Sequence, residues 1–270
     1  MNKVKKYVKM LASTDEETLN KIKEYEKKGL LNEHLDTNPA PYKKVDENFE
    51  YLPKNIFRRA KLSLQRFFFV GPLRKETNKL FQTIVNGREN IKGLHGAVIC
   101  SNHINKLDCM AIEYALKHKI YFTAAEFNNM EGFVGDMMRA GRMLPMSSTF
   151  SGQKNFLNTL SILLKKGCFV NFFPERAEWW CYKKPRPQHN GAYNVAVKNN
   201  VPVVPVFITF NETEDSKKSP LGFKQFVVNI LEPIYPDENL SLKDNVEKMM
   251  QNCASQWQET YENFYKKKEV

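Results

Sequence analysis

The chain has 270 residues, with 41 lysines and arginines against 30 acidic residues, which gives a formal net charge of +11 at pH 7. This length can bury a large core, and the charge predicts acidic partners such as phospholipid headgroups, coenzyme A, an acidic carrier protein or nucleic acid. The sequence excludes a spanning helix, which needs roughly 18 uninterrupted apolar residues, and its five scattered cysteines exclude a full disulfide framework.

The first 75 residues are expected to form an N-terminal helical segment. Residues 3–31 are charged with helical apolar spacing, and Ser13 and Glu16 have the spacing of a capping box that starts a helix. After a polar connector, residues 57–73 combine four cations with a run of phenylalanines. Such a helix suits the surface of an anionic membrane. The alternative is a helix that packs its aromatic side chains on the rest of the protein.

Residues 76–270 are expected to form an α/β domain. Helical and strand-like segments alternate between about residues 76 and 210, which indicates a central, largely parallel sheet flanked by helices. Buried strands are predicted at residues 96–100, 168–173 and 201–206, and a C-terminal helix at about residues 241–267.

A histidine and a carboxylate follow the first of these strands, in the segment Asn102-His103-x-x-x-x-Asp108. A turn at this strand-to-helix junction could fold the Asp108 carboxylate back onto the imidazole. A carboxylate on one ring nitrogen fixes the tautomer and leaves the other nitrogen free to accept a proton from a hydroxyl. The alternative is a helix cap or a surface hydrogen bond. Cys100 and Cys109 flank this motif, so a cysteine–histidine nucleophile is a further alternative.

Three more blocks follow at characteristic intervals. They are Gly141-Arg142-Met143-Leu144-Pro145-Met146, Phe173-Pro174-Glu175 and Val201-Pro202-Val203-Val204-Pro205-Val206. In this order and spacing, the four blocks resemble the glycerolipid acyltransferase superfamily, whose best-known members are lysophosphatidate (1-acylglycerol-3-phosphate) acyltransferases. The resemblance runs from about residue 86 to residue 210.

The resemblance implies an O-acyltransferase with a glycerol-3-phosphate acyltransferase-like fold. His103 would be the base that deprotonates the acceptor hydroxyl, Asp108 its orienting partner, Asn102 a substrate-binding neighbour, and Glu175 a residue of the acceptor site. The donor would be acyl-CoA or an acyl carrier protein, the acceptor a lysophospholipid or glycerophosphate, and neither a metal nor another cofactor would be required.

Two departures from the family pattern affect recognition of an acceptor phosphate. Arg176-Ala177-Glu178 stands where the family usually has Gly, a small hydroxyl residue and Arg, and Ser147 stands where a phosphate-contacting Arg is usual. Cations at new positions could replace these contacts, or they could be solvated surface charges. The candidate substrate-binding cations are Arg139, Arg142, Arg176, Lys183, Lys184 and Arg186.

We therefore expect a cytoplasmic enzyme that lies peripherally on the anionic inner face of a membrane. One alternative is an acyltransferase for a glycolipid or an envelope-polymer precursor. Another is a non-catalytic basic protein that binds membranes or nucleic acid, although the common nucleic-acid-binding motifs are missing from the sequence, and we do not expect nucleic acid as a partner.

Overall fold

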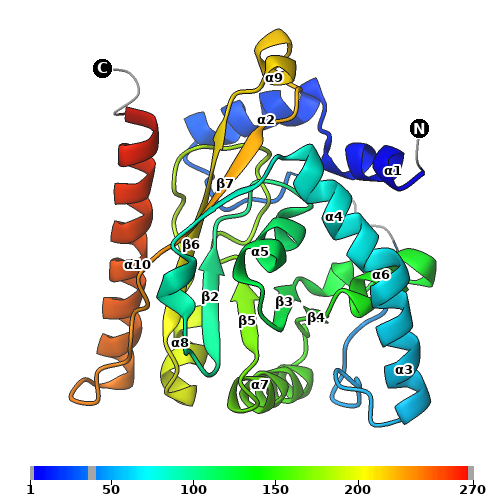
Figure 1. Cartoon of the computed structure of the whole chain (residues 1–270). Coiled ribbons are helices and arrows are strands. Elements are labelled where there is room, and N and C mark those ends of the chain that lie inside the picture. The colour runs from blue at the N-terminus through cyan, green and yellow to red at the C-terminus, as the bar shows by residue number, and fades with distance from the viewer. Residues whose placement is uncertain (1–2, 36–40, 267–270) are drawn as a thin grey trace.

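The computed structural model describes residues 3–35 and 41–266 (Figure 1). The central residues of the predicted connector, 36–40, and Lys267 at the end of the predicted C-terminal helix lie outside these ranges. Within them, seven strands form one sheet in the order β1-β7-β6-β2-β5-β3-β4. The strands are β1 (Ile84–Asn86), β2 (Ala97–Ser101), β3 (Ile120–Ala124), β4 (Met143–Pro145), β5 (Phe169–Phe172), β6 (Val203–Asn211) and β7 (Gln225–Ile230).

The sheet is largely parallel, as predicted. Strands β6, β2, β5, β3 and β4 run in one direction, whereas β7 is antiparallel to β6 and pairs in parallel with β1. The three predicted strands correspond to β2, β5 and β6. Because Val98 of β2 pairs with Val170 on one side and with Val203 on the other, β2 lies at the centre of the parallel part. The loops that follow β2 and β5 therefore meet at one edge of the sheet.

Helices cover both faces of the sheet (Figure 1). One face carries α1 (Lys3–Ala12), α4 (Gly71–Leu80) and α5 (Asp108–Leu116), and the other carries α7 (Phe150–Lys165), α8 (Gly191–Asn199) and α10 (Leu242–Tyr265). Successive strand residues point to opposite faces, so Ile99 joins the first core and Val98 the second. The remaining helices are α2 (Glu16–Lys27), α3 (Ile56–Gln65), α6 (Gly132–Ala140), α9 (Glu214–Lys218) and the short turns η1 (Arg66–Val70), η2 (Arg88–Ile91) and η3 (Glu126–Asn128).

The N-terminal residues form two helices. The N-cap of α2 is Asp15, whose side chain accepts a hydrogen bond from the Thr18 N–H at 2.8 Å. The predicted capping role of Ser13 is therefore wrong, because the Ser13 hydroxyl donates instead to the Met10 carbonyl at 2.8 Å. Val8 and Ala12 of α1 are buried in the core shared with α5, and Ile22 of α2 packs in a third cluster with two tryptophans. These contacts join the N-terminal segment to the α/β domain, while a domain boundary at residue 75 stays a prediction.

Residues 41–55, which begin within the predicted connector at 32–48, lie along β4 at the edge of the sheet. The Lys43 N–H donates to the Asn129 carbonyl at 3.0 Å, and the Tyr51 hydroxyl donates to the Pro145 carbonyl at 2.8 Å. The Ser147 hydroxyl donates to the Val45 carbonyl at 2.5 Å. This cover protects a short edge strand from pairing with another chain.

The aromatic side chains of the predicted interfacial helix face solvent. Helix α3 buries no residue, and it continues through η1, a π-helical turn, into α4. Phe57 is 81%, Phe67 73% and Phe68 61% exposed, so these rings do not pack on the sheet. In the described residues, no helix is long and apolar enough to cross a membrane.

Candidate active site

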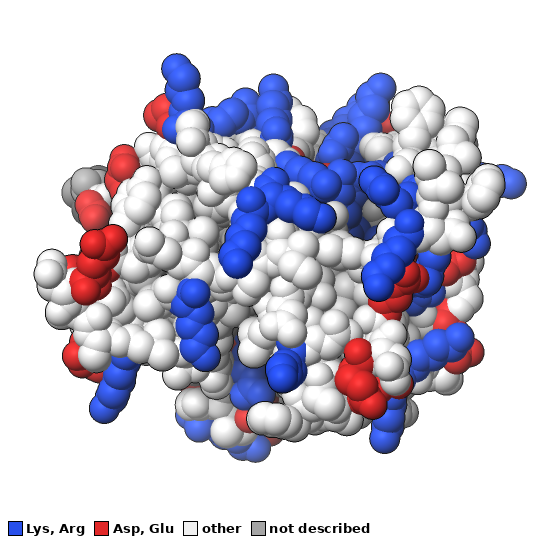
Figure 2. Space-filling model, turned by 90° about the horizontal axis from the view of Figure 1, so that it is seen from below, with Lys and Arg blue, Asp and Glu red and all other residues white. Residues whose placement is uncertain are grey.

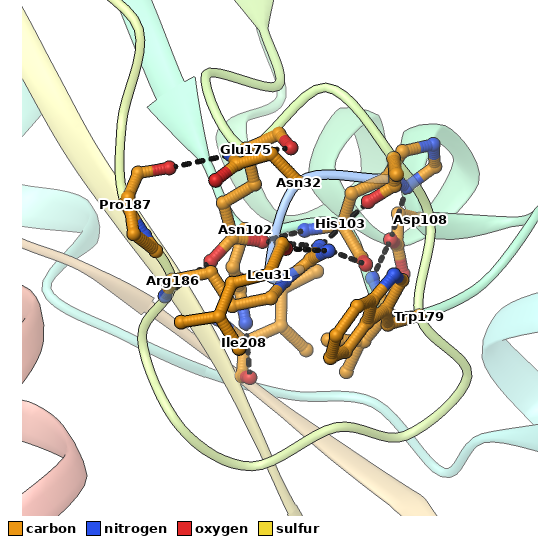
Figure 3. Close-up of polar contacts among 12 residues, drawn as sticks. Leu31, Asn32, Asn102, His103, Asp108, Glu175, Trp179, Arg186, Pro187 and Ile208 are labelled. Carbon is orange, nitrogen blue, oxygen red and sulfur yellow. Dashed lines mark hydrogen bonds and ion pairs between the residues drawn. The ribbon is translucent and has the colours of Figure 1, made fainter. Parts of the chain in front are cut away.

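His103 and Asp108 are brought together where β2 ends and α5 begins (Figure 3). Their Nδ1 and Oδ2 atoms lie 3.0 Å apart. The same Oδ2 accepts the backbone N–H groups of Ile104 at 2.7 Å and Asn105 at 2.9 Å. These two bonds wrap the intervening loop around the carboxylate, which is how residues five apart come to face each other.

The Asp108 carboxyl is fully buried. Burial raises the pKa of this carboxyl, while the His103 ring and the N–H groups of Asn105 and Ile104 lower it. Its second oxygen, Oδ1, has no hydrogen-bond partner in the part of the chain that the structure describes. All the polar contacts of the carboxylate therefore converge on Oδ2, the atom that fixes the imidazole.

The His103 ring is held on one face as well as at one nitrogen. It stacks on the Phe173 ring with centroids 3.9 Å apart and an angle of 17° between the planes. The side chain is 21% exposed. Nε2 has no hydrogen-bond partner within residues 3–35 and 41–266. The dyad thus offers an oriented basic nitrogen to a molecule outside the protein.

Glu175 and Arg186 hold the loop that carries His103. Glu175 Oε2 accepts the His103 N–H at 3.1 Å and Arg186 Nη2 at 2.8 Å, and Oε1 accepts the Arg186 N–H at 3.0 Å. Both side chains are only 1% exposed. Arg186 also donates to the Ala177 carbonyl at 2.6 Å and lies over the Trp179 ring at 4.8 Å. In this arrangement both side chains hold the loop of His103 and are shielded from solvent.

The loop after β5 is locked onto the His103 loop by further backbone bonds (Figure 3). The Trp179 N–H donates to the His103 carbonyl at 3.0 Å, and the Cys181 N–H donates to the Ile104 carbonyl at 2.8 Å. Asn32, from the connector, donates to the Glu175 carbonyl at 3.0 Å and to the Pro187 carbonyl at 2.8 Å. Sequence reasoning missed Asn32, because one asparagine in a polar connector has no distinguishing pattern.

Asn102 joins the end of β2 to β6. Its Nδ2 donates to the Ile208 carbonyl at 3.0 Å, and its Oδ1 accepts the Ile208 N–H at 2.7 Å. The side chain is 2% exposed. Both polar groups of the amide are therefore used within the fold, and a contact with substrate stays a prediction.

Of the predicted substrate-binding cations, Arg186 contacts the His103 loop directly, with Nη2 3.3 Å from the His103 carbonyl, whereas four others have partners elsewhere. Arg139 bonds Asn129 and Asp136, Lys184 forms an ion pair with Glu26 at 2.6 Å, and Lys183 lies over the Tyr265 ring at 5.3 Å. Arg142 precedes β4, so it lies at the opposite edge of the parallel sheet.

Arg176 belongs to the loop after β5, which is hydrogen-bonded to the His103 loop. It follows Glu175, has a left-handed backbone with φ of 67°, and its side chain is exposed. Burial lowers the pKa of His34 and of His189, and Arg176 lowers both pKa values further. Arg176 thus acts electrostatically on both imidazoles. The sequence offers no partner for His34, and for His189 it allows either a place in the site or a place on the surface.

Burial changes the pKa values of a carboxyl and two thiols near the dyad. Burial raises the pKa of the Glu178 carboxyl, with His103 lowering it and Asp108 raising it. Burial also raises the pKa of the Cys109 thiol to about 12 and that of Cys100 well above its usual value. Neither thiol is therefore a thiolate at neutral pH, which argues against the cysteine–histidine alternative. Among the described residues, no group of three or more His, Cys, Asp or Glu side chains is arranged to hold a metal ion.

Comparisons with known proteins concern the family and the fold. The model of the family described as Acyltransferase matches residues 82–209, which include the loops of His103 and Glu175. No curated protein sequence matches the chain. The crystal structure of the 1-acyl-sn-glycerophosphate (LPA) acyltransferase PlsC from Thermotoga maritima is similar, with a TM-score of 0.50 and 21% identity over 76% of this chain and 89% of that chain. The predicted resemblance and fold class are confirmed, and at this identity the structural likeness concerns the fold.

Proposed function

Since residues 82–209 match the acyltransferase family, we propose that the protein is an O-acyltransferase that moves a fatty acyl group from an acyl thioester to the hydroxyl of a lipid acceptor. One observation carries the proposal. The His103 ring is fixed by Asp108 at 3.0 Å, while its other nitrogen has no hydrogen-bond partner among the described residues, at the edge where the carboxyl ends of parallel strands open. Ligands of open α/β sheets bind at this edge.

The proposed transfer needs one base and no covalent acyl-enzyme. His103 Nε2 accepts the proton of the acceptor hydroxyl as its oxygen attacks the thioester carbonyl. The tetrahedral intermediate then expels the thiolate of coenzyme A or of a carrier protein, and the imidazolium returns the proton to that sulfur. The Asp108 carboxylate stabilises the imidazolium during these steps because it lies 3.0 Å from Nδ1.

The first candidate acceptor is a lysophospholipid or glycerophosphate. The structurally similar protein of Thermotoga maritima is named for 1-acyl-sn-glycerophosphate. In this chain Arg176 would bind the acceptor phosphate, since it is exposed beside Glu175. Arg176→Gln should then raise the KM for a phosphorylated acceptor about tenfold or more and leave the KM of the donor unchanged.

The second candidate acceptor is a glycolipid or envelope precursor without a phosphate at this position. It is favoured by the use of the other cations within the fold, and by the buried Ser147, which bonds the Val45 carbonyl at 2.5 Å. A similar loss in Arg176→Gln with phosphorylated and unphosphorylated acceptors would support this candidate over the first.

The third element of the proposal is an anionic membrane as the surface on which the enzyme works. The exposed rings of Phe57, Phe67 and Phe68 share one helical run with Arg58, Arg59 and Lys61. Apolar rings and cations on one surface helix suit the boundary between headgroups and acyl chains.

Thioester release measured against a panel of acceptors tests the proposal. His103→Ala should lower turnover at least ~100-fold, the usual effect of losing a general base, with little change in donor binding. His95→Ala, at an exposed histidine before β2, is the matched control and should keep its activity. A folded His103→Ala protein with near-normal turnover would exclude this mechanism. No turnover with any thioester and acceptor would favour a binding protein instead.

A further inference from the structure

A basic cleft lies at the edge of the sheet opposite to His103. Its volume is about 490 Å³. The charged side chains that line it are Arg66, Arg74, Glu113, Lys117, Lys119 and Arg142. Figure 2, which views the molecule from below Figure 1, shows lysine and arginine side chains gathered toward the centre of this face. Five cations against one carboxylate leave the cleft with a large positive excess.

Three arginines share the single carboxylate of Glu113. Arg66 Nη2 bonds Glu113 Oε1, Arg74 Nη1 lies 3.3 Å from Oε2, and Arg142 Nη1 lies 3.5 Å from Oε1. The Glu113 side chain is 6% exposed, so it is shielded from solvent by these guanidinium groups. Arg66 Nη1 also donates to the Ala140 carbonyl at 3.0 Å, and one carboxylate cannot neutralise three cations.

The neighbouring cations of the cluster affect the pKa of Arg66. Burial lowers the pKa of Arg66, Glu113 raises it, and Arg142 and Arg74 lower it again. On the other wall, Arg142 and Lys119 both lie over the Tyr121 ring, at 5.8 and 5.9 Å from its centroid. An anion in the cleft would relieve this mutual repulsion and would meet donors already fixed in place.

Uncommon backbone conformations place these cations. Arg66 lies in the π-helical turn η1, a form that is rare and recurs at functional sites. Arg142 and Lys117 have φ angles of 65° and 49°, in the left-handed region that residues with a Cβ seldom adopt. Lys117 is the C-cap of α5, where a left-handed residue is common, so the π-helical turn at Arg66 and the backbone of Arg142 are the two uncommon conformations at the cluster.

The cleft is separate from the transfer site. From strand spacing and rise, the Cα atoms of Arg142 and His103 lie roughly 20 Å apart. Arg66 is followed in the same turn by Phe67 and Phe68, which are 73% and 61% exposed. The cleft therefore opens near the apolar side chains of the surface helix, where a lipid headgroup would come within reach.

We infer that this cleft binds a phosphate ester with at least two negative charges. Guanidinium groups match phosphate oxygens in charge and in hydrogen-bond geometry, and a cleft of about 490 Å³ can hold a phosphorylated headgroup. The headgroup of an acidic phospholipid and a soluble phosphate ester share this chemistry. The exposed phenylalanines beside Arg66 favour the lipid as the source.

Calorimetric titration of the full chain with inorganic pyrophosphate tests the inference. The double variant Arg74→Gln/Arg142→Gln should bind pyrophosphate at least ~10-fold more weakly, since each charge-assisted bond can account for such a factor. Lys198→Gln/Lys243→Gln removes the same charge from exposed positions on α8 and α10 and should bind as the unchanged protein does. Equal weakening in both pairs, or in neither, would overturn the inference.

Two further variants control for a folding defect and test for an effect of opposite sign on pyrophosphate binding. Lys117→Gln/Lys119→Gln alters exposed side chains and should weaken pyrophosphate binding without lowering the melting temperature. Glu113→Gln removes the competing carboxylate and should tighten binding; weaker binding in a folded Glu113→Gln protein would count against the cleft.

Sedimentation with phosphatidylcholine vesicles, with and without phosphatidate, identifies the source. If phosphatidate-dependent binding falls in Arg74→Gln/Arg142→Gln, the ligand is a lipid headgroup, and if only pyrophosphate binding falls, it is a soluble ester. Both results support the cleft. All of these measurements are made without turnover, so their failure and the failure of the proposed acyl transfer are distinguishable.

Discussion

The replacement Asp108→Asn isolates the charge of the dyad from its geometry. The asparagine carbonyl oxygen can take the place of Oδ2 and keep the bonds from Ile104 and Asn105 at 2.7 and 2.9 Å, as well as the bond from the His103 ring. The amide nitrogen then replaces Oδ1, which is buried and has no hydrogen-bond partner in the described parts of the chain. We therefore expect a folded protein whose unfolding free energy is lower by about 1–3 kcal/mol, the cost of an unsatisfied buried donor.

The larger effect should fall on turnover. Two unit charges about 4 Å apart interact by roughly 4 kcal/mol at the effective dielectric constant of about 20 that suits protein sites. The His103 side chain is 21% exposed, so solvent screens part of this. A loss of about 2–4 kcal/mol corresponds to a roughly 30- to 1,000-fold lower kcat. The loss in kcat would be larger if the replacement also changed the tautomer of the His103 ring.

The assay is steady-state thioester release at saturating acceptor, with melting curves measured in parallel. Asp237→Asn, at an aspartate paired with Lys248 at 3.0 Å near α10, is the matched control and should leave kcat unchanged. If Asp108→Asn had the kcat of the unchanged protein, the carboxylate would serve as a helix cap and not as a stabiliser of the imidazolium. A rise in the donor KM without a change in kcat would refute the reasoning equally.

Three further predictions concern stability and the surface helix. Arg186→Met leaves the Glu175 carboxylate buried without its cation and should lower the unfolding free energy by about 3–5 kcal/mol in denaturant titrations, and Arg186→Met/Glu175→Leu should recover part of it; no recovery would show that the pair is not coupled. The raised pKa of Glu178 means that the folded state binds a proton more tightly than the unfolded chain, so its contribution to stability is lost as pH rises through the folded pKa. Glu178→Gln should therefore melt higher at pH 7, with a difference that disappears toward pH 4, and a lower melting temperature at pH 7 would contradict this sign. Replacing Phe67, Phe68 and Phe69 by serine should weaken binding to anionic vesicles about 100-fold at an unchanged melting temperature, since the rings are 73%, 61% and 49% exposed; a large drop in melting temperature would instead indicate that they pack in the core.

The parts of the fold and of the site that follow from short-range pattern could be predicted from the sequence. The strand at 96–100 and the helix beginning near Asp108 follow from apolar spacing, and a turn between them forces His103 and Asp108 together. The separation of Arg142 from His103 could not be predicted, because it depends on where β4 lies in the sheet. This strand has only three residues, and Arg142 directly precedes it.

The burial of the Arg186 charge also could not be predicted from short-range sequence patterns. The stretch Lys183-Lys184-Pro185-Arg186-Pro187 has the composition of an exposed loop, and Lys184 is indeed exposed. Arg186 is buried because Glu175, eleven residues earlier, offers a carboxylate that would otherwise be unpaired. Glu175 was itself predicted to contact substrate, so the sequence pattern gave no reason to pair it with Arg186.

The hydrogen bonds that fasten the N-terminal helices to the loops at the carboxyl edge have a consequence for synthesis of the chain. Trp180 Nε1 donates to the Ala12 carbonyl at 2.9 Å, and Asn32 donates to the Pro187 carbonyl at 2.8 Å, across intervals of 168 and 155 residues. A ribosome adding about 5–20 residues per second needs roughly 8 to 30 seconds to make 150 residues. During that interval α1 and α2 have emerged without their partners. The His103 loop therefore acquires its final form late in translation, after the residues that follow β5 have been made.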